Sequence, residues 1–580
     1  MLCKGTVIFM EKKIPNFSDL FKAFDLPTPH PGRAKKDRKP WPRTVRYLIN
    51  ILVTALYAAI SFYVTLPVLD FHFTEFYTYI FGVLIVLAIV SFLTRLRAGH
   101  VSSSQAAVHT RRLPVYIIVA LVVFAAVGAL FSAQIFRASS YRDLLTVAEG
   151  NFVEDVEEIS FSQIPMLDKD SAERLGDRRL GDLPDMVSQF EVSSEYSQIN
   201  YNDRPVRVTP LQYGDLIKWF NNRSEGIPAY VMVDMVTQEA SVVRLEEGEK
   251  IRYTTDEHFS RYLMRHLRFH YPTYQFSTPT FEIDEQGDPY WICPRIVKRI
   301  GLFGGTDVAG AVLVNAATGS CQYFPVDEVP QWVDRVYPAD LIVEQYDFHG
   351  TYVNGFFNSI FGQSGVTVTT DGYNYLALND DVYLYTGITS VGGDKSNIGF
   401  ILVNQRTKEA KYYPCAGAQE RSAMSSAEGV VQHLAYNATF PLLLNISDQP
   451  TYFMALKDSA ELVKMYAMVN VQQYQIVATG STVEECEKAY IQQLTENKVI
   501  SEGQPSISTT TLTGRVAEIR SAVIDGNTYY YIRLQDGMAY YRIAASASPD
   551  AILLNPGDEI TVTFTPSDEA IVNADRVVRS

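Results

Sequence analysis

Three uncharged apolar stretches near the start of the chain constrain its fold more than any other feature. They span Tyr47–Leu69, Phe76–Leu93 and Leu113–Phe136. A helix rises about 1.5 Å per residue, so roughly 20 apolar residues cross the hydrocarbon core of a bilayer. A soluble protein can bury one such helix in its core, but three in close succession with polar or charged ends favour lipid. We therefore predict an α-helical membrane anchor of three spans within residues 47–136.

The distribution of Lys and Arg around these stretches predicts their orientation. Seven basic residues precede the first stretch, between Arg33 and Arg46, and four lie between the second and the third. The first connection, Asp70–Glu75, contains none. Because basic flanks stay in the cytoplasm, we predict a multi-pass cell-membrane protein with a cytoplasmic, Pro-rich tail over residues 1–46 and an extracytoplasmic part over residues 137–580. The first stretch lies too far from the start and is too long for a cleaved signal peptide, and Met1 and Met10 are both candidate start sites.

The extracytoplasmic part is strongly acidic. Residues 137–580 hold 35 Lys and Arg against 59 Asp and Glu, a difference of 24 in favour of the acids. This charge argues against nucleic acid as a partner. A segment of this length exceeds one small core, so several modules are expected. The cysteines of this part are too dispersed for a disulfide framework: they are Cys293, Cys321, Cys415 and Cys486. Cys293 and Cys321 could still pair. A large exported part with few cysteines is typical of bacterial proteins.

An internal repeat lies between residues 206 and 500. Three apolar strands end in an Asx residue that is followed three positions later by Thr, at Asp234 and Thr237, Asn315 and Thr318, and Asn404 and Thr407. A fourth strand ends at Asn470 without the Thr. An Asx side chain bonds to the backbone two residues on, so each site predicts a structural turn between two strands. Amphipathic helical patterns and a further hairpin precede three of these turns, which predicts tandem α+β modules whose sheets each bury one face against a helix.

The segment VNAATGSCQYF, Val314 to Phe324, resembles the PepSY-type module, a small extracytoplasmic α+β domain. That resemblance implies non-catalytic modules, several of which regulate neighbouring proteins of the cell envelope. Lys408 follows Thr407 where the module's pattern has Gly, and the fourth copy lacks the Thr.

The segments before and after the repeats differ from them in composition and residue pattern. We expect Ser139–Gly150 to continue the third stretch as a helix, and residues 137–205 as a whole to form a connecting segment, since residues 151–205 are mixed and acidic with Gly at apparent turn positions. Residues 501–511 are a polar linker. Residues 512–580 alternate polar and apolar positions between tight turns, and the segment NPGDEITV resembles a strand of an OB-like barrel, so we expect a small all-β barrel.

Only one pair of residues suggests metal chemistry. His266 and His270 lie four positions apart on an expected helix, a spacing that can hold zinc, but the Glu of a metalloprotease motif is missing. Helix-surface histidines are the simpler interpretation. The sequence therefore predicts no catalytic residue and no cofactor.

Taken together, these features predict a non-enzymatic binding or assembly protein of the cell envelope. Its expected partners are the lipid bilayer and another envelope protein, and a homo-oligomer stays open. Two alternatives are an envelope hydrolase with a metal site at His266 and His270, and a subunit of a membrane transport assembly. The spans disfavour the transport assembly because they carry almost no polar side chain that could line a path.

Overall fold

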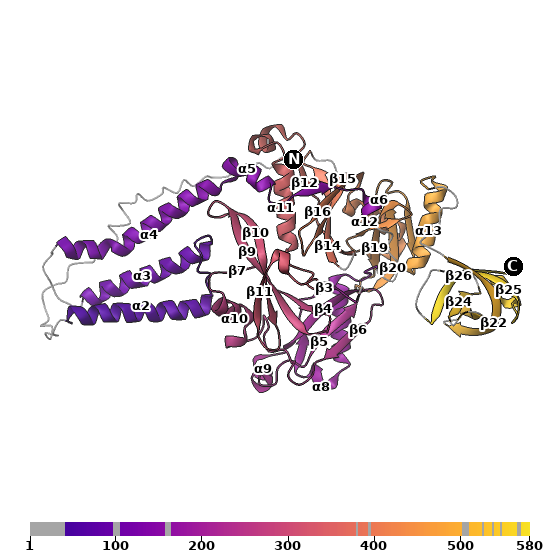
Figure 1. Cartoon of the computed structure of the whole chain (residues 1–580), viewed down its shortest axis with the longest axis horizontal. Helices are drawn as coiled ribbons and strands as arrows, with labels where there is room; N and C mark the ends of the chain where they lie inside the picture. Colours follow the sequence, from indigo (N-terminus) through magenta and orange to yellow (C-terminus); the bar gives the residue numbers. More distant parts are fainter. Residues whose placement is uncertain are drawn as a thin grey trace, which may run out of the picture.

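The computed structural model describes most of the chain. The described residues are 41–96, 105–156, 164–202, 204–378, 381–392, 396–500, 510–524, 527–535, 537, 539–545, 548–564 and 570–579. The predictions for residues 1–40 and for most of the linker therefore lie outside the described residues. Figure 1 shows the long N-terminal helices at one end, several sheets in the middle and a barrel at the other end.

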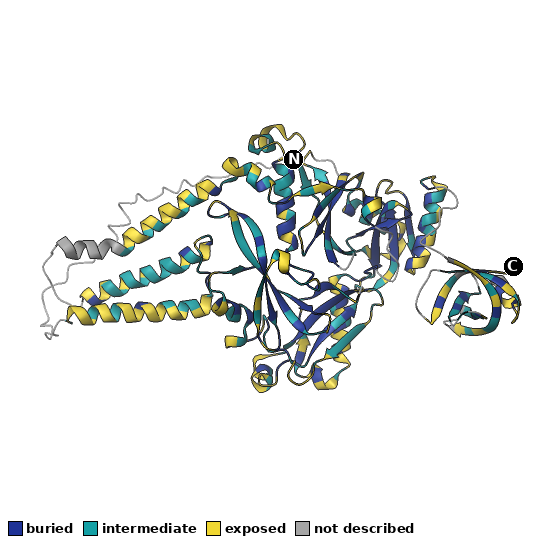
Figure 2. Cartoon of the chain, in the orientation of Figure 1, coloured by how far each residue is buried: buried dark blue, intermediate teal, exposed yellow. Residues whose placement is uncertain are grey.

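Three helices are long and apolar enough to cross a membrane, which supports a membrane-anchored protein. They are Arg43–Thr65 (α2), Thr74–Leu96 (α3) and the part Pro114–Ser132 of Gln105–Ser132 (α4). Few of their side chains are buried inside the protein, as Figure 2 shows by colour. α2 stops because Leu66 adopts a left-handed conformation directly before Pro67, whose ring cannot continue the helix.

The third helix is followed by a break, and the structure corrects the helical continuation expected over residues 139–150. Ala133 is extended, and a short helix, Gln134–Arg142 (α5), then ends at Arg142. Val147–Glu149 (β1) forms a strand that pairs in parallel with Ala410–Ala418 (β16). By pairing with the free edge of that sheet, β1 gains hydrogen-bond partners for its backbone N–H and C=O groups.

Four antiparallel sheets follow, and each contains five strands in the same order. In each sheet the first, third, fourth and fifth strands lie side by side, and the second pairs with the third. The first sheet is β2 (Phe190–Val192), β3 (Ser197–Tyr201), β4 (Arg204–Tyr213), β5 (Ala229–Asp234) and β6 (Ala240–Arg244). The second is β7 (Gln275–Phe276), β8 (Thr280–Ile283), β9 (Pro289–Ile300), β10 (Gly304–Asn315) and β11 (Cys321–Pro325).

The third and fourth sheets repeat this order. The third is β12 (Thr367–Thr369), β13 (Asn374–Leu378), β14 (Asp381–Ser390), β15 (Ser396–Asn404) and β16, with β1 added at its edge. The fourth is β17 (Asn437–Ala438), β18 (Leu442–Ile446), β19 (Gln449–Lys457), β20 (Val463–Asn470) and β21 (Val477–Gly480).

A helix precedes each sheet in the chain, and one more follows the last. The four preceding helices are α7 (Lys169–Gly181), α10 (Leu263–His270), α11 (Ala339–Thr351) and α12 (Glu420–Val430), and the last is α13 (Val483–Glu496). Shorter helical segments are α6 (Phe152–Asp155), α8 (Pro184–Val187), α9 (Leu216–Asn222), η2 (Phe259–Arg261), η3 (Val326–Glu328), η4 (Asn358–Gly362), η5 (Gln432–Leu434) and η6 (Pro549–Leu553).

The sheets pack in series and share their cores, so the expectation of one buried face per sheet is wrong for the second, third and fourth. Trp291 of β9 belongs to a core shared with the first sheet, whereas its neighbour Ile292 belongs to a core shared with the third. Tyr452 faces the third sheet and Phe453 packs against α13. Strands with both faces buried are apolar at nearly every position, which is the pattern these strands have.

The segment expected as a connection over residues 137–205 instead supplies part of the first sheet. α7 packs on this sheet through Ala172 and Leu180, and β2 and β3 pair with β4. Gly176, which suggested a turn, lies inside the helix, where a Cβ would meet the Tyr196 hydroxyl at 2.1 Å. The helix escaped detection because three of its four buried residues, Ser171, Ala172 and Gly176, are small, and only Leu180 is large and apolar.

A closed five-stranded barrel ends the chain. Its strands are β22 (Thr510–Ile524), β23 (Asn527–Leu534), β24 (Tyr540–Ala544), β25 (Glu559–Phe564) and β26 (Ile571–Arg579), in the spatial order β22-β23-β24-β26-β25. β24 and β26 are parallel, and β22 closes the barrel against β25. The first strand begins at Thr510, two residues before the expected start.

Candidate functional site

A cleft lies where the first three sheets meet, and its volume is about 600 Å³. The β2–β3 connection, residues 277–281, β9, β13 and the start of α11 contribute to its wall. Its charged and aromatic side chains are Lys169, Glu195, Tyr196, Phe281, Arg335, Tyr337, Asp340, Glu344, Tyr373 and Tyr375. A volume of this size falls within the ~300–1,000 Å³ that ligand pockets occupy.

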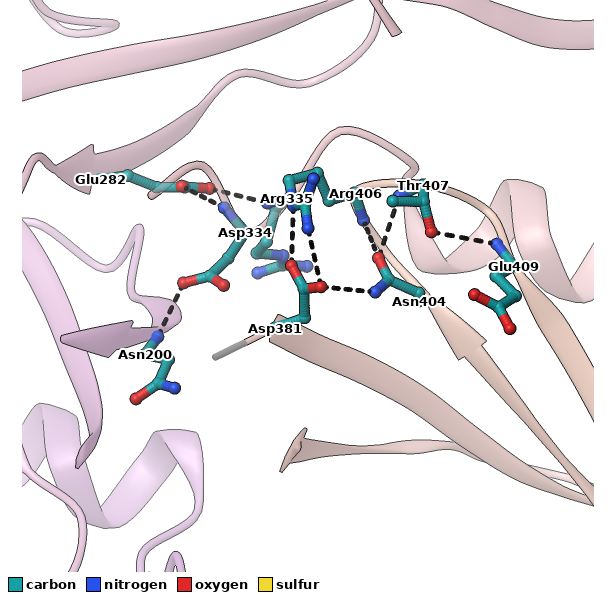
Figure 3. Close-up of polar contacts among 9 residues, drawn as sticks. All are labelled: Asn200, Glu282, Asp334, Arg335, Asp381, Asn404, Arg406, Thr407 and Glu409. Carbon is teal, nitrogen blue, oxygen red and sulfur yellow. Dashed lines mark hydrogen bonds and ion pairs between the residues drawn. The ribbon is translucent and has the colours of Figure 1, made fainter. Parts of the chain in front are cut away.

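A buried carboxylate holds the connection between the second and third sheets in place. Glu282, on β8, accepts hydrogen bonds from the backbone N–H groups of Asp334 (2.9 Å) and Arg335 (3.2 Å). Asp334 in turn accepts from the backbone N–H of Asn200 on β3, at 2.7 Å. Burial raises the pKa of Glu282 to about 7, against the opposing effect of the two N–H donors. Figure 3 shows this chain of contacts running from the first sheet to the second.

Arg335 extends from this connection to the cleft wall. Its guanidinium donates to the Tyr375 hydroxyl at 2.9 Å and also lies over the Tyr375 ring, 4.9 Å from its centroid. Arg207 on β4 is buried nearby and donates to Gln198 at 3.2 Å. Burial, together with the positive charge of Arg335, lowers the pKa of Arg207 to about 10. The buried Arg207 guanidinium therefore lies near the guanidinium of Arg335, which lines the cleft.

A second polar cluster fixes the third sheet against the same connection. Arg406 donates two hydrogen bonds to Asp381, at 2.7 and 2.8 Å, and Asn404 donates a third, at 2.8 Å. The Gln405 carbonyl accepts from the backbone N–H groups of Val336 and Tyr337. Bidentate pairs of this kind specify one geometry, so Arg406 holds the start of β14 in a defined position beside the connection (Figure 3).

The structure places the predicted turn residues in Asx turns between successive long strands. Oδ1 of each Asx residue accepts a hydrogen bond from the backbone N–H three residues on. These pairs are Asp234 with Thr237, Asn315 with Thr318, Asn404 with Thr407, and Asn470 with Gln473. Asn404 is the one that also takes part in the cluster at the cleft.

His266 and His270 lie on one face of α10, and the structure brings Cys321 of β11 to them. One ligand atom from each of the three residues lies within 4.8 Å of the others. No sequence pattern indicated that Cys321 lies near the two histidines. It comes 51 residues after His270 and reaches the helix only through the β10–β11 turn. Cys293 and Cys321 are both free, and β10 separates their strands.

The network behind the cleft was also missed by sequence reasoning. Glu282, the pair Asp334 and Arg335, and Asp381 lie in three separate parts of the sequence. Only the position of Glu282 between two apolar residues of a strand, Phe281 and Ile283, could have indicated a buried carboxylate.

Comparisons with known proteins do not identify the chain. No family model matches it, and no curated protein matches it. Among solved structures, a levansucrase mutant of B. megaterium aligns over 76% of this chain and 98% of that chain, with 9% identity and a TM-score of 0.16. A similarity of that size carries no argument about fold or function.

Proposed function

We propose that this chain is a membrane-anchored binding or assembly protein of the cell envelope, and that the cleft between its first three sheets holds an extended segment of a partner protein. The observation that carries the proposal is the cleft itself, with walls fixed by the Glu282 and Asp381 clusters. The proposal places the N-terminus in the cytoplasm and residues 137–580 outside the cell membrane, on the charge distribution described above.

The lining of the cleft suits a polypeptide. Tyrosine rings and prolines offer flat apolar contacts, as Tyr373, Tyr375 and Pro279 do. Lys169 and Asp340 offer charges of opposite sign at exposed positions. A peptide presents apolar side chains, charges and backbone groups together, whereas the acidic surface repels nucleic acid.

The module architecture supports a non-catalytic role. We interpret the four sheets as copies of one α+β module of PepSY-like type, because their strand order recurs and an Asx turn recurs between their long strands. We interpret the final barrel as OB-like, because five strands close in the order β22-β23-β24-β26-β25 with a short helical turn between β24 and β25.

The proposal is tested by photo-crosslinking in the native membrane. A photoreactive amino acid replaces Tyr373, which is 37% exposed in the cleft wall, and a control replaces the exposed Glu247 in the loop after β6. We expect one envelope protein to be captured at position 373 and not at 247, with a lower yield in Lys169→Glu. Equal capture at both positions, or none at 373 in intact membranes, would overturn the proposal.

A further inference from the structure

We propose that His266, His270 and Cys321 form a zinc site that joins α10 to the β10–β11 turn of the second sheet. The site requires no partner and stands apart from the cleft. Two imidazoles and a thiolate with room for a water or a fourth ligand are a donor set that Zn²⁺ prefers, whereas Ca²⁺ and Mg²⁺ require oxygen ligands.

The backbone fixes the two histidines in a state that can bind a metal. His266 Nε2 lies 2.7 Å from the Gly319 carbonyl oxygen, and His270 Nδ1 lies 2.8 Å from the His266 carbonyl oxygen. A carbonyl only accepts, so these two nitrogens carry the protons of the neutral rings. The other nitrogen of each ring then carries a lone pair, and the hydrogen bond of each ring to a carbonyl holds its orientation, as in many metal-ligating histidines.

The thiol is brought to the histidines by a rigid turn. Asn315 Oδ1 accepts from the N–H groups of Ala317 and Thr318, and Gly319 follows with φ of +75°. The Gly319 carbonyl is contacted by both His266 Nε2 and Cys321 Sγ, the latter at 3.4 Å. The Gly319 carbonyl thus places the His266 ring beside the Cys321 sulfur, and the nitrogen of His266 that is left to bind a metal is Nδ1.

The surroundings provide access on one side and shielding on the other. His270 is exposed, whereas His266 and Cys321 are half-buried, and the Tyr253 ring packs against His266 with centroids 4.5 Å apart. An ion can therefore enter past His270 and keep a water as its fourth ligand.

The position of the site gives the metal a structural consequence. α10 contacts the end of α2, because Arg265 donates to the Tyr63 carbonyl and Arg268 donates to the Leu66 carbonyl. Zinc would tie β11 to the helix that makes these contacts and would stiffen the connection between the second sheet and the membrane helices.

The experiment uses the full-length protein in nanodiscs, stripped with a chelator and titrated with Zn²⁺ by calorimetry. We expect one zinc per chain, and with Co²⁺ in its place an absorption band of thiolate-to-metal charge transfer. Removing one ligand should weaken zinc binding by at least about tenfold in His270→Gln and in Cys321→Ser. His433→Gln, an exposed histidine far from the cluster in the sequence, is the matched control.

The titration distinguishes loss of the zinc site from loss of the fold. His270 is exposed, so His270→Gln is expected to keep the fold, and its loss of zinc reports on the site rather than on unfolding. Absence of stoichiometric zinc in the wild-type protein would overturn the proposal. Unchanged zinc binding in both His270→Gln and Cys321→Ser, or a preference for Cu⁺ over Zn²⁺, would overturn it equally.

Discussion

At the scale of single residues, Glu282 is the group on which the junction of the sheets depends. It is fully buried, and its two oxygens accept from the backbone of residues 334 and 335 rather than from a cation. Burial of a carboxylate without a direct ion pair favours its protonated form. The pKa of about 7 follows from this burial, since the two N–H donors compensate only in part.

The raised pKa of Glu282 predicts how stability depends on pH. The folded value, about 7, lies above the ordinary value of 4.5, so the folded protein holds this proton more tightly than the unfolded chain does. The stabilisation is therefore complete below pH 4.5 and is lost as the pH rises through 7. We expect the thermal midpoint to fall from about pH 5 to about pH 8, and this fall to be smaller in Glu282→Gln.

The same variant has a second expected effect. The Gln amide NH₂ cannot accept the second backbone N–H, so Glu282→Gln should also be less stable at pH 5, by about 1–3 kcal/mol. Calorimetry across the pH range checks both effects, with the exposed Glu247→Gln as the control that follows the wild type. A Glu282→Gln protein that keeps the full pH dependence would show that another group titrates.

At the scale of elements, the β9–β10 hairpin docks the sheets onto the long apolar helices. Its tip reaches the end of α4, where Ser132 Oγ accepts from the N–H groups of Leu302 (2.8 Å) and Phe303 (3.0 Å). Gly128 allows this approach, because a Cβ there would meet the Leu302 side chain at 2.2 Å. Gly301 and Gly304 of the tip also lie against this helix end, because a Cβ on either residue would come within about 3.0 Å of Ser132.

Removing the Ser132 hydroxyl should loosen this hairpin. Ser132→Ala leaves two amide groups without their acceptor, at about 1–3 kcal/mol for each buried donor. We expect hydrogen–deuterium exchange at Leu302 and Phe303 to become at least about tenfold faster in nanodiscs, with β19 and β20 unchanged. Ser139→Ala, an exposed serine on α5, is the control. Unchanged exchange at the tip would mean that the hydroxyl does not anchor it.

At the scale of the whole molecule, four sheets and their helices form one continuous stack. Residues from neighbouring sheets meet in each of three shared cores, and the fourth core lies under α13. The first and last sheets also meet, because Gln238 donates to the Tyr466 hydroxyl at 2.6 Å and Lys457 forms an ion pair with Asp168, the N-cap of α7. The barrel has a separate core formed by its own residues.

The proposed orientation of the whole chain is open to direct measurement. Val523, 70% exposed on the barrel, is replaced by Cys in the otherwise unchanged chain. We expect a membrane-impermeant maleimide to label Cys at 523 in intact cells, and Cys3 to react only after the membrane is permeabilised. Labelling of Cys3 in intact cells, with protection of position 523, would reverse the assigned orientation.

The sequence by itself determined the features that depend on local pattern. The length of the apolar stretches predicted the three candidate spans, although α4 breaks at Ala133 and ends before the predicted Phe136. The Asx residues gave the turns, because an Asx side chain bonds to the backbone within three residues and needs no tertiary partner. Thr482 likewise acts as a local N-cap, because its side chain accepts from Glu485 N–H within the first turn of α13.

Only the tertiary structure decided which faces are buried and which distant residues meet. α7 was missed because its buried face is mostly small residues, with Leu180 the one large apolar residue, and the burial of small residues depends on the sheet beneath them. Cys321 and His266 meet because a hairpin returns to a helix, and Glu282 becomes buried where the connection at residues 334 and 335 folds back onto it. Such contacts arise from long-range packing, and no local pattern of residues encodes that packing, so a single sequence gives the elements but not the sites they form.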